Sequence, residues 1–529
     1  MKNPDTTPNS TASLERTAAL VHALDNPLAL GHPLRSLRLL ETHISWIILT
    51  GNYAYKIKKP VNLGFLDFST LERRRHFCHE ELRLNRRFAP QIYVDVIEIR
   101  GTVDAPRLHG EGTAIEYALQ MIEFPQQCLL SHHAADGTLT ATMVDAIAVR
   151  VNELHASADS APPESAFGSA HSVHRWSEEN LSQIANAVPD SLMPASFGRL
   201  QRWYQDNADL LDQVERRKHD GRVRDCHGDL HLDNMALIDN EVMPFDCIEF
   251  NPELRWIDTI SEAAFVAMDL QARGYPGFGW RFISLYLENS ADYDAIVLLR
   301  YYFIYRALVR AKVEALRIDT AARSTAANFA AAFSYLDLAD QWCAKRPVGM
   351  IIMHGLSGSG KSTVAAQLVE ALGALRIRSD IVRKQLFELA PDSDSNSAPN
   401  QGIYSPEATA MTYLRLSQIA ARVIAAKFHV IVDATFLKEA DRRQLLELES
   451  STAFACVIVV CDAPEAVLRE RISKRENDPS EANLQVLERQ IKSRQAISDQ
   501  ETGMATVVNI GADGLANQQI EQIRALLVN

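Results

Sequence analysis

The chain has 529 residues and a mass of 59.0 kDa, and 47% of its residues are apolar. This is too long for one compact core and too hydrophobic for a disordered chain, so we expect two or three globular domains. The 54 Lys and Arg residues against 67 Asp and Glu give a formal charge of −13, which argues against binding to long nucleic acids or to a membrane surface.

The cysteines and the N-terminal residues favour a cytoplasmic protein. The seven cysteines are scattered without a CxxC pair, which indicates reduced thiols. The first twenty residues lack the apolar segment of a secretion signal. The most hydrophobic stretch, 295–309, is interrupted by Arg300 and Arg306, so we expect a helix of a globular fold there and no membrane span.

The first part of the chain has the pattern of a small β-rich lobe followed by a mainly helical region. Residues 44–60 contain two β-rich runs around Thr50-Gly51-Asn52, which predicts a hairpin. The spacing of apolar residues changes to that of a helix over 70–89. Further strands are expected at 92–100, 114–122, 234–238 and 242–246, and a surface loop at 156–172.

A domain boundary is expected at 344–347. The helical pattern ends there, and an apolar strand begins after Pro347. Runs of β-branched residues then alternate with helical segments, which is typical of βαβ units on a parallel sheet. We therefore expect a first domain at 1–344 and a second, α/β domain at 347–529.

One segment of the first domain has the residue spacing of a kinase catalytic loop. His227-Gly228-Asp229-Leu230-His231-Leu232-Asp233-Asn234 is followed, after a predicted hairpin, by Asp246. In kinase-like phosphotransfer one Asp accepts the proton of the attacking hydroxyl, while a later Asn and Asp hold Mg²⁺. We therefore predict Asp229 as the catalytic base and Asn234 and Asp246 as magnesium ligands.

Such a site also needs a lysine for the nucleotide and a glutamate that pairs with it. Lys56 and Lys58 share one face of a predicted strand, and Lys56 is our choice. Glu81 lies on the apolar stripe of the helix at 70–89 and is our choice for the pairing glutamate, with Glu80 as the alternative.

The second domain begins with a phosphate-binding motif. The sequence from Gly355 to Ser362 matches GxxxxGK[ST], between a predicted buried strand and an amphipathic helix. Its backbone N–H groups and the helix N-terminus suit phosphate, while the lysine reaches the terminal phosphates and the serine hydroxyl ligates Mg²⁺. The predicted nucleotide-binding residues are Gly355, Ser357, Gly358, Ser359, Gly360, Lys361, Ser362 and Thr363, and Ser362 is also a predicted magnesium ligand.

Two other strands of this domain end in acidic residues. Asp433 ends the run HVIVD and suits the magnesium site, although a turn residue is the alternative. Asp380 follows the second strand and is our candidate to accept a proton from an acceptor hydroxyl, and Arg383 our candidate to pair with a substrate phosphate. The segment SDIVR is equally well explained as a helix N-cap with its first turn.

A charged helix after the strand FACVIVV carries the last candidates. Arg471 and Arg475 are four residues apart and so share one face, from which they could stabilise charge on the transferred phosphoryl group. A solvated face with salt bridges is the alternative explanation.

Residues 348–529 resemble small kinases of the P-loop class that includes polynucleotide kinase and zeta-toxin-like phosphotransferases. This resemblance implies that Lys361 and Ser362 bind nucleotide, that Asp380 activates the acceptor hydroxyl, and that Arg471 and Arg475 are lid arginines.

The first domain resembles the aminoglycoside phosphotransferase family through HGDLHLDN and FDCIE. The resemblance implies an α+β bilobal protein-kinase-like fold that uses ATP and Mg²⁺. Where protein kinases have GxGxxG, this chain has only Thr50-Gly51-Asn52. The pairing with a P-loop domain resembles bacterial proteins that combine both kinase types.

We therefore predict a two-module ATP-dependent phosphotransferase that acts on a hydroxyl of a small molecule. A nucleotide or short oligonucleotide 5′-hydroxyl is the alternative acceptor for the second module. An ATP-binding regulator without phosphotransfer is the alternative function. The sequence leaves open the acceptor, the oligomeric state and whether both modules are active.

Overall fold

The computed structural model divides into two compact units, each described here by itself. The first unit contains described residues of 1–139, 158–168 and 222–257, and the second those of 140–157, 169–221 and 258–529. The boundary expected at 344–347 lies within the second unit and stays a prediction. The structure describes residues 8–64, 66–318, 325–390, 393, 395, 401–448, 453–474 and 483–528.

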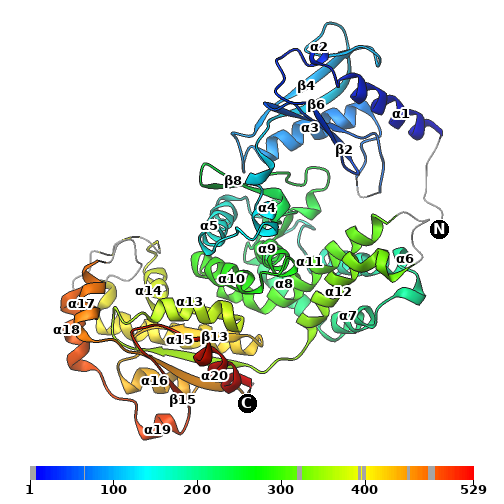
Figure 1. Ribbon diagram of the computed structural model, residues 1–529. Coiled ribbons are helices and arrows are strands. Elements are labelled where there is room, and N and C mark those ends of the chain that lie inside the picture. Colours follow the sequence, from blue (N-terminus) through cyan, green and yellow to red (C-terminus); the bar gives the residue numbers. More distant parts are fainter. Residues whose placement is uncertain are drawn as a thin grey trace. The chain divides into compact units, whose positions relative to one another are not determined.

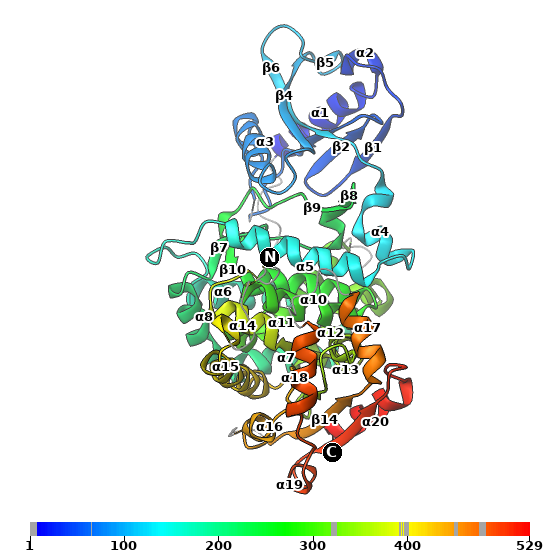
Figure 2. The same cartoon turned by 90° about the vertical axis from the view of Figure 1, so that its left-hand side faces the viewer.

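An antiparallel sheet of six strands is the main element of the first unit, in the order β1-β2-β3-β6-β4-β5. The hairpin predicted around residues 50–52 is confirmed, because β2 and β3 pair with Leu49 opposite Ala54. Helix α3 packs against β4 and β6 and begins at Thr70, whose hydroxyl accepts a hydrogen bond from the Arg73 N–H (Figure 2). The strands are Arg38–Glu41 (β1), Ser45–Leu49 (β2), Tyr53–Lys58 (β3), Tyr93–Gly101 (β4), Pro106–Leu108 (β5) and Ala114–Ile122 (β6), and the helices are Pro8–Ala23 (α1), Pro27–Leu30 (α2), Leu71–Asn85 (α3) and Leu130–Ala135 (α4).

A second, smaller β region completes this unit. Strand β7 (Val223–Asp225) pairs with β10 (Trp256–Asp258), and β8 (Met235–Ile238) forms a hairpin with β9 (Glu241–Pro244). The kinase-type segment lies between β7 and β8, and Asp246 follows β9. The predicted strand at 242–246 therefore starts and ends earlier than expected.

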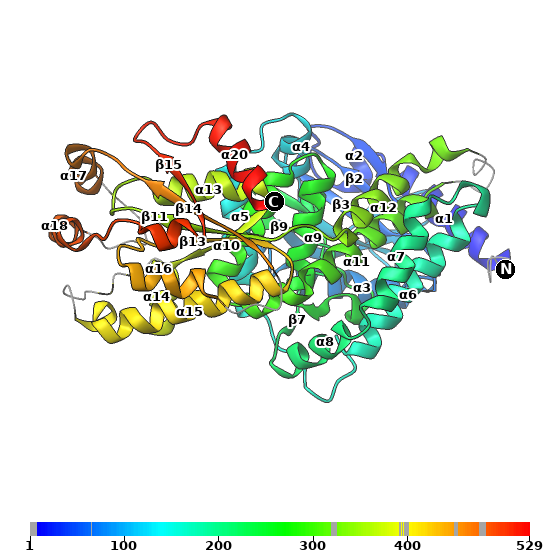
Figure 3. The same cartoon turned by 90° about the horizontal axis from the view of Figure 1, so that it is seen from below.

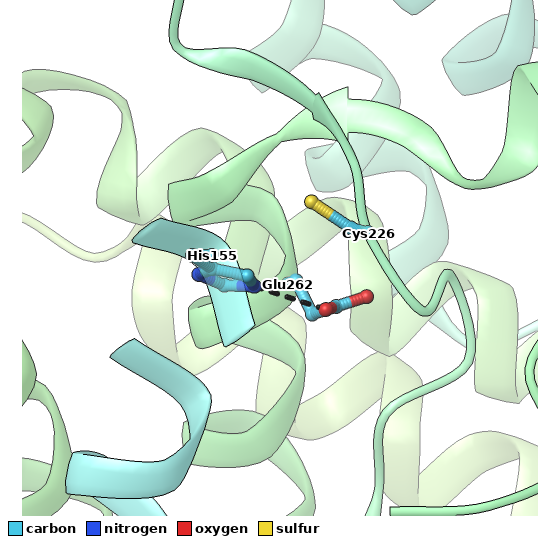
Figure 4. A group of neighbouring side chains, drawn as sticks. All are labelled: His155, Cys226 and Glu262. Atoms are coloured by element: carbon cyan, nitrogen blue, oxygen red, sulfur yellow. Dashed lines mark hydrogen bonds and ion pairs between the residues drawn. The ribbon is translucent and has the colours of Figure 1, made fainter. Parts of the chain in front are cut away.

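The second unit begins with a group of helices around α11, which packs against α6, α9 and α12. Polar contacts also join helices of this group. His155 of α5 lies 3.0 Å from the Glu262 carboxylate of α9 (Figure 4). The other ring nitrogen of His155 lies 2.9 Å from the Tyr286 hydroxyl of α10. In the described part of the chain, no helix is both long and apolar enough to cross a membrane. These helices are Ala141–Ser157 (α5), Ala170–Ala187 (α6), Ala195–Asp206 (α7), Leu210–His219 (α8), Thr259–Ala272 (α9), Pro276–Ser290 (α10), Ile296–Leu316 (α11) and Ala330–Cys343 (α12).

A parallel five-stranded sheet forms the rest of the second unit, in the order β12-β13-β11-β14-β15. Helices α13 and α20 cover one face, and α15 and α16 the other (Figure 3). The strands are Gly349–His354 (β11), Ala374–Arg378 (β12), His429–Asp433 (β13), Ala455–Cys461 (β14) and Thr506–Ile510 (β15). The helices are Lys361–Leu372 (α13), Ser379–Leu386 (α14), Pro406–Ala425 (α15), Glu439–Leu446 (α16), Glu465–Ser473 (α17), Leu484–Ser493 (α18), Asp499–Thr502 (α19) and Asn517–Val528 (α20) (Figure 1).

Candidate functional sites

Asp229, Asn234 and Asp246 make two pairs of side-chain contacts, Asn234 with Asp229 and Asp246 with Lys56, and the Phe245 N–H donates to the Asn234 carbonyl at 2.9 Å. The Asn234 side-chain amide donates to the Asp229 carbonyl at 2.9 Å and to its carboxylate at 3.1 Å. Lys56 Nζ lies 2.5 Å from Asp246 Oδ1. The side chains of Asp229 and Asp246 are 38% and 44% exposed, so both carboxylates are accessible to a substrate or an ion.

Two backbone positions in this region, Gly228 and Asp246, have positive φ angles. Asp246 has a φ of 63°, which is uncommon for a residue other than glycine. Its N–H donates to the Tyr93 hydroxyl at 2.9 Å. Gly228 has a φ of 89°, and a Cβ there would lie 2.7 Å from the Leu254 carbonyl oxygen. The Tyr93 hydrogen bond thus supports the backbone at Asp246, and the position before Asp229 has room only for glycine.

Glu81 is fully buried and accepts hydrogen bonds from both candidate lysines. Lys56 Nζ donates to its Oε1 at 2.7 Å, and Lys58 Nζ donates to its Oε2 at 2.5 Å. Lys58 also pairs with Glu249, a buried residue that the sequence reading did not single out. Glu80 instead forms an ion pair with Arg83 of the same helix. The geometry therefore favours Glu81 over Glu80. The two lysines share Glu81, and each has one further carboxylate partner, Asp246 for Lys56 and Glu249 for Lys58.

The charges in this network stabilise one another. Burial alone would raise the pKa of Glu81, but Lys56 and Lys58 outweigh burial and lower it to about 2. Burial would lower the pKa of Lys56, but the carboxylates of Asp246 and Glu81 raise it well above its ordinary value. Glu81 is therefore ionised and Lys56 protonated at neutral pH.

The turn at Thr50-Gly51-Asn52 joins β2 to β3 and is hydrogen-bonded to Glu123, the residue that follows β6. The Gly51 N–H donates to the Glu123 carboxylate at 2.6 Å, and the Glu123 N–H donates to the Asn52 carbonyl at 3.0 Å. The Gly51 N–H therefore has a carboxylate partner within the protein.

The motif from Gly355 to Ser362 lies between β11 and α13, as the sequence predicted. Gly355 passes so close to Cys461 that a Cβ would lie 2.3 Å from its carbonyl oxygen. Gly360 has a φ of 90° and begins helix α13. Lys361 Nζ donates to the Leu356 carbonyl at 2.8 Å, whereas Ser362 and Thr363 are exposed. This is a phosphate-binding loop in its usual strand–loop–helix context.

Two buried polar atoms beside this loop suit the groups that the motif would bind. Asp433 ends β13, next to β11, and is 5% exposed. Among the described residues, its Oδ2 atom and the Ser359 Oγ atom have no hydrogen-bond partner. A buried polar atom without a partner costs free energy unless a ligand satisfies it. A carboxylate oxygen is a suitable ligand for Mg²⁺ and a hydroxyl a suitable donor to phosphate, so these residues fit Mg²⁺ and a nucleotide.

Asp380 and Arg383 lie on α14, directly after β12. Arg378, the last residue of β12, is opposite Asp433, the last residue of β13. Asp380 follows Arg378 by two residues and therefore lies at the carboxyl-end edge of the sheet, as Asp433 does. Asp380 is half-buried. Arg383 is buried and donates to the Ile403 carbonyl at 2.7 Å. The structure therefore brings Asp380 to the expected edge, whereas Arg383 anchors the segment that precedes α15.

Helices α17 and α18 contact the phosphate-binding loop. Arg471 donates to the carbonyl oxygens of Gly358 and Ala512, at 3.3 and 3.1 Å. Arg475 lies outside the described residues. Gln490 of α18, which the sequence reading missed, accepts from the Ser357 N–H at 2.8 Å and donates to the Ser357 hydroxyl at 3.0 Å. A lone glutamine on an amphipathic helix gives no sequence signal for such a contact.

These elements define the class of the protein: a chain that joins a kinase-like antiparallel lobe to a P-loop α/β domain. The fold class expected from the sequence is thereby confirmed. The family model described as an AAA domain matches residues 350–497. The chain belongs to the same family as an uncharacterized protein of Mycobacterium tuberculosis and one of Mycobacterium bovis. Each is 30% identical over 447 residues, which are 84% of this chain and 88% of the relative.

Among solved structures, amicoumacin kinase hAmiN in complex with AMP-PNP, Ca²⁺ and Ami is 13% identical, with a TM-score of 0.40. The match covers 64% of this chain and 96% of that protein. A sugar kinase from Janibacter sp. is 20% identical with a TM-score of 0.27, over 34% of this chain and 94% of that one. At these TM-scores the fold assignment rests on the strand orders and motifs described above.

Proposed function

We propose that this protein is an ATP-dependent phosphotransferase with two kinase-type modules, each of which transfers the γ-phosphoryl group of ATP to a hydroxyl of a small molecule. The observation that carries the proposal is the contact of Lys56 with both Glu81 and Asp246. Kinase-like phosphotransfer uses such a lysine–glutamate pair together with a magnesium-binding Asp. The P-loop beside Asp433 supports nucleotide binding by the second module.

In the first module, the oxygen of the acceptor hydroxyl would attack the γ-phosphorus of ATP, and Asp229 would accept the proton of that hydroxyl. The bond from that phosphorus to the ADP oxygen breaks as the new bond forms, and ADP leaves. Lys56, held by Glu81, would bind phosphate oxygens and stabilise their charge. Magnesium held by Asn234 and Asp246 would neutralise charge on the phosphates.

In the second module, Asp380 would have the same role towards its own acceptor. Lys361 would bind the terminal phosphates, and Ser362 and Asp433 would hold Mg²⁺. Arg383 would pair with a substrate phosphate, and Arg471 and Arg475 would stabilise charge on the transferred phosphoryl group.

We propose a small hydroxyl-bearing acceptor for each module and a cytoplasmic location, in keeping with the formal charge of −13 and the reduced cysteines. A nucleotide or short oligonucleotide 5′-hydroxyl is an alternative acceptor for the second module. Small acceptors are favoured because a negatively charged chain repels a long phosphate backbone.

Calorimetry and labelled ATP test the proposal on the full chain. We expect two magnesium-dependent ATP sites, of which Lys361→Ala removes one. With γ-labelled ATP and a metabolite extract, the wild-type protein labels acceptors. Asp229→Ala and Lys361→Ala each remove a different set of labelled products.

A matched pair of strand-end aspartates tests the metal site of the second module. Asp433→Asn is expected to weaken magnesium-dependent ATP binding about 10- to 100-fold. Asp462 follows strand β14 of the same sheet and is an exposed partner of Arg494. Asp462→Asn is expected to leave ATP binding unchanged. ATP binding without labelled products in any preparation would indicate a regulator, and absence of ATP binding would refute the nucleotide-dependent function altogether.

A further inference from the structure

Helix α10 covers the outer edge of the P-loop sheet. Strand β12 is the edge strand, and its Arg376 N–H donates to the Ser284 hydroxyl of α10 at 2.9 Å. An edge strand otherwise presents unpaired N–H groups to solvent. The Ser284 hydroxyl of α10 therefore supplies a partner for this N–H group of the edge strand.

A single buried residue of α10 connects to both elements that flank Asp380. The Glu288 carboxylate, in a residue only 1% exposed, accepts from Arg376 of β12 at 3.0 and 3.4 Å. Its backbone carbonyl accepts from the Gln385 side chain of α14 at 2.6 Å. Asp380 lies between these two attachments, at the start of α14.

The same arginine also reaches the phosphate-binding loop. Arg376 Nη1 donates to the Ser362 carbonyl at 3.4 Å. Ser362 is the P-loop serine whose hydroxyl is the predicted magnesium ligand. A continuous set of contacts thus leads from the P-loop through Arg376 to Glu288 on a helix of the preceding helical region.

Another part of α10 attaches to the P-loop region in a way that does not involve β12. Arg281 donates to Glu370 of α13 at 2.7 Å and also to Asp145 of α5 at 2.6 Å. Since Arg281 keeps Asp145 if Glu370 is changed, this contact supplies a matched control.

We propose that Glu288 is a positioning residue of the P-loop module. It fixes β12 and α14 around Asp380 and makes α10 respond to nucleotide in the P-loop. The inference rests on nucleotide binding by the P-loop, which is part of the proposed function. Coupling of this kind is reciprocal: if nucleotide stabilises the attachment of α10, loss of the attachment must change the free energy of nucleotide binding equally.

Amide hydrogen exchange on the full chain, without ligand, tests the attachment. Glu288→Ala removes the carboxylate that accepts from Arg376 and keeps the backbone carbonyl that accepts from Gln385, so it is expected to speed exchange in 374–378 by about fivefold. Ser284→Ala is a milder second variant that removes only the partner of the Arg376 N–H, and it is expected to speed exchange in the same segment. Glu370→Gln should leave this segment unchanged. Unchanged exchange in both α10 variants would overturn the proposal.

Addition of magnesium and AMP-PNP tests the coupling. We expect slower exchange in 276–290 of the wild-type protein and no such effect in Lys361→Ala. In Glu288→Ala, calorimetry should still show nucleotide at the P-loop, weakened by the same factor by which nucleotide slows exchange in 276–290 of the wild-type protein, while the effect on 276–290 disappears. If Glu288 only stabilised the fold, the variant would be less stable, but bound nucleotide would still slow exchange in 276–290. If Glu288→Ala transmits the effect normally, the positioning role is wrong.

If the P-loop does not bind nucleotide, the same experiments give a result that differs from failure of the Glu288 proposal alone. If Lys361→Ala changes neither the calorimetry nor the exchange, the P-loop does not bind nucleotide and coupling to nucleotide is overturned with it. The ligand-free comparison then still decides whether Glu288 holds β12.

Discussion

Lys56 Nζ lies 2.5 Å from Asp246 Oδ1, although 190 residues separate them in the sequence. The lysine comes from the central region of the antiparallel sheet and the aspartate from the segment after β9. This contact, together with that of Lys56 with Glu81, is the basis on which we propose Lys56 as a phosphate-binding cation and Asp246 as a metal ligand.

Replacement of Lys56 is expected to impair chemistry in the first module. In a Lys361→Ala background, which silences the second module, Lys56→Met should lower turnover of labelled ATP about 100- to 1,000-fold, because a charge that stabilises the transferred phosphoryl group is lost. Lys59→Met is the control, since Lys59 pairs with the exposed Glu41. Equal losses in both variants would contradict the role of Lys56.

Replacement of Lys58 is expected to impair stability. Lys58 is 1% exposed and pairs with Glu81 and Glu249. When Lys58 is replaced, Glu81 keeps Lys56 as a partner, whereas Glu249 loses the lysine with which it pairs. Lys58→Met should destabilise the fold by about 3–5 kcal/mol, because it leaves a buried carboxylate uncompensated. Urea denaturation measures this loss, and adding Glu249→Gln should recover part of it. A Lys58→Met protein as stable as wild type would refute the prediction.

Gln490 is expected to support nucleotide binding through Ser357. Gln490→Ala removes both hydrogen bonds from α18 to the loop and should weaken ATP binding about five- to tenfold by calorimetry. Lys492→Ala changes an exposed residue of the same helix and should have no effect. Matching affinities of the two variants would show that the loop is held by other contacts.

His354 is expected to make stability depend on pH. It precedes Gly355 and lies 3.0 Å from the Phe436 carbonyl, and burial lowers its pKa from 6.5 to about 4. Between these values the unfolded chain takes up a proton that the folded chain does not. The stability contribution is therefore present above pH 6.5 and is lost as the pH falls towards 4.

A comparison with His354→Gln isolates this contribution from that of other groups. Thermal unfolding should show a larger drop in melting temperature from pH 7 to pH 4 for wild type than for the variant. Parallel pH profiles would mean that His354 does not titrate in this range.

The local motifs were predictable because each is encoded in a few adjacent residues. A phosphate-binding loop needs glycines and a lysine at fixed spacing between a strand and a helix, so Gly355 to Ser362 could be placed from the sequence. Asp229, Asn234 and Asp246 followed from the spacing of a catalytic loop. The inward position of Glu81 followed from helical periodicity, since the apolar stripe of α3 includes it.

Contacts between distant segments were decided only by the tertiary structure. Periodicity puts Lys56 and Lys58 on one face of β3, but it says nothing of Asp246 or Glu249, the further carboxylate partners that distinguish the two lysines. The attachment of Glu288 to Arg376 likewise depends on how α10 packs against β12. A sequence specifies which side chains an element presents; the packing of elements against one another decides which charges meet in a buried environment, where each must find its partner.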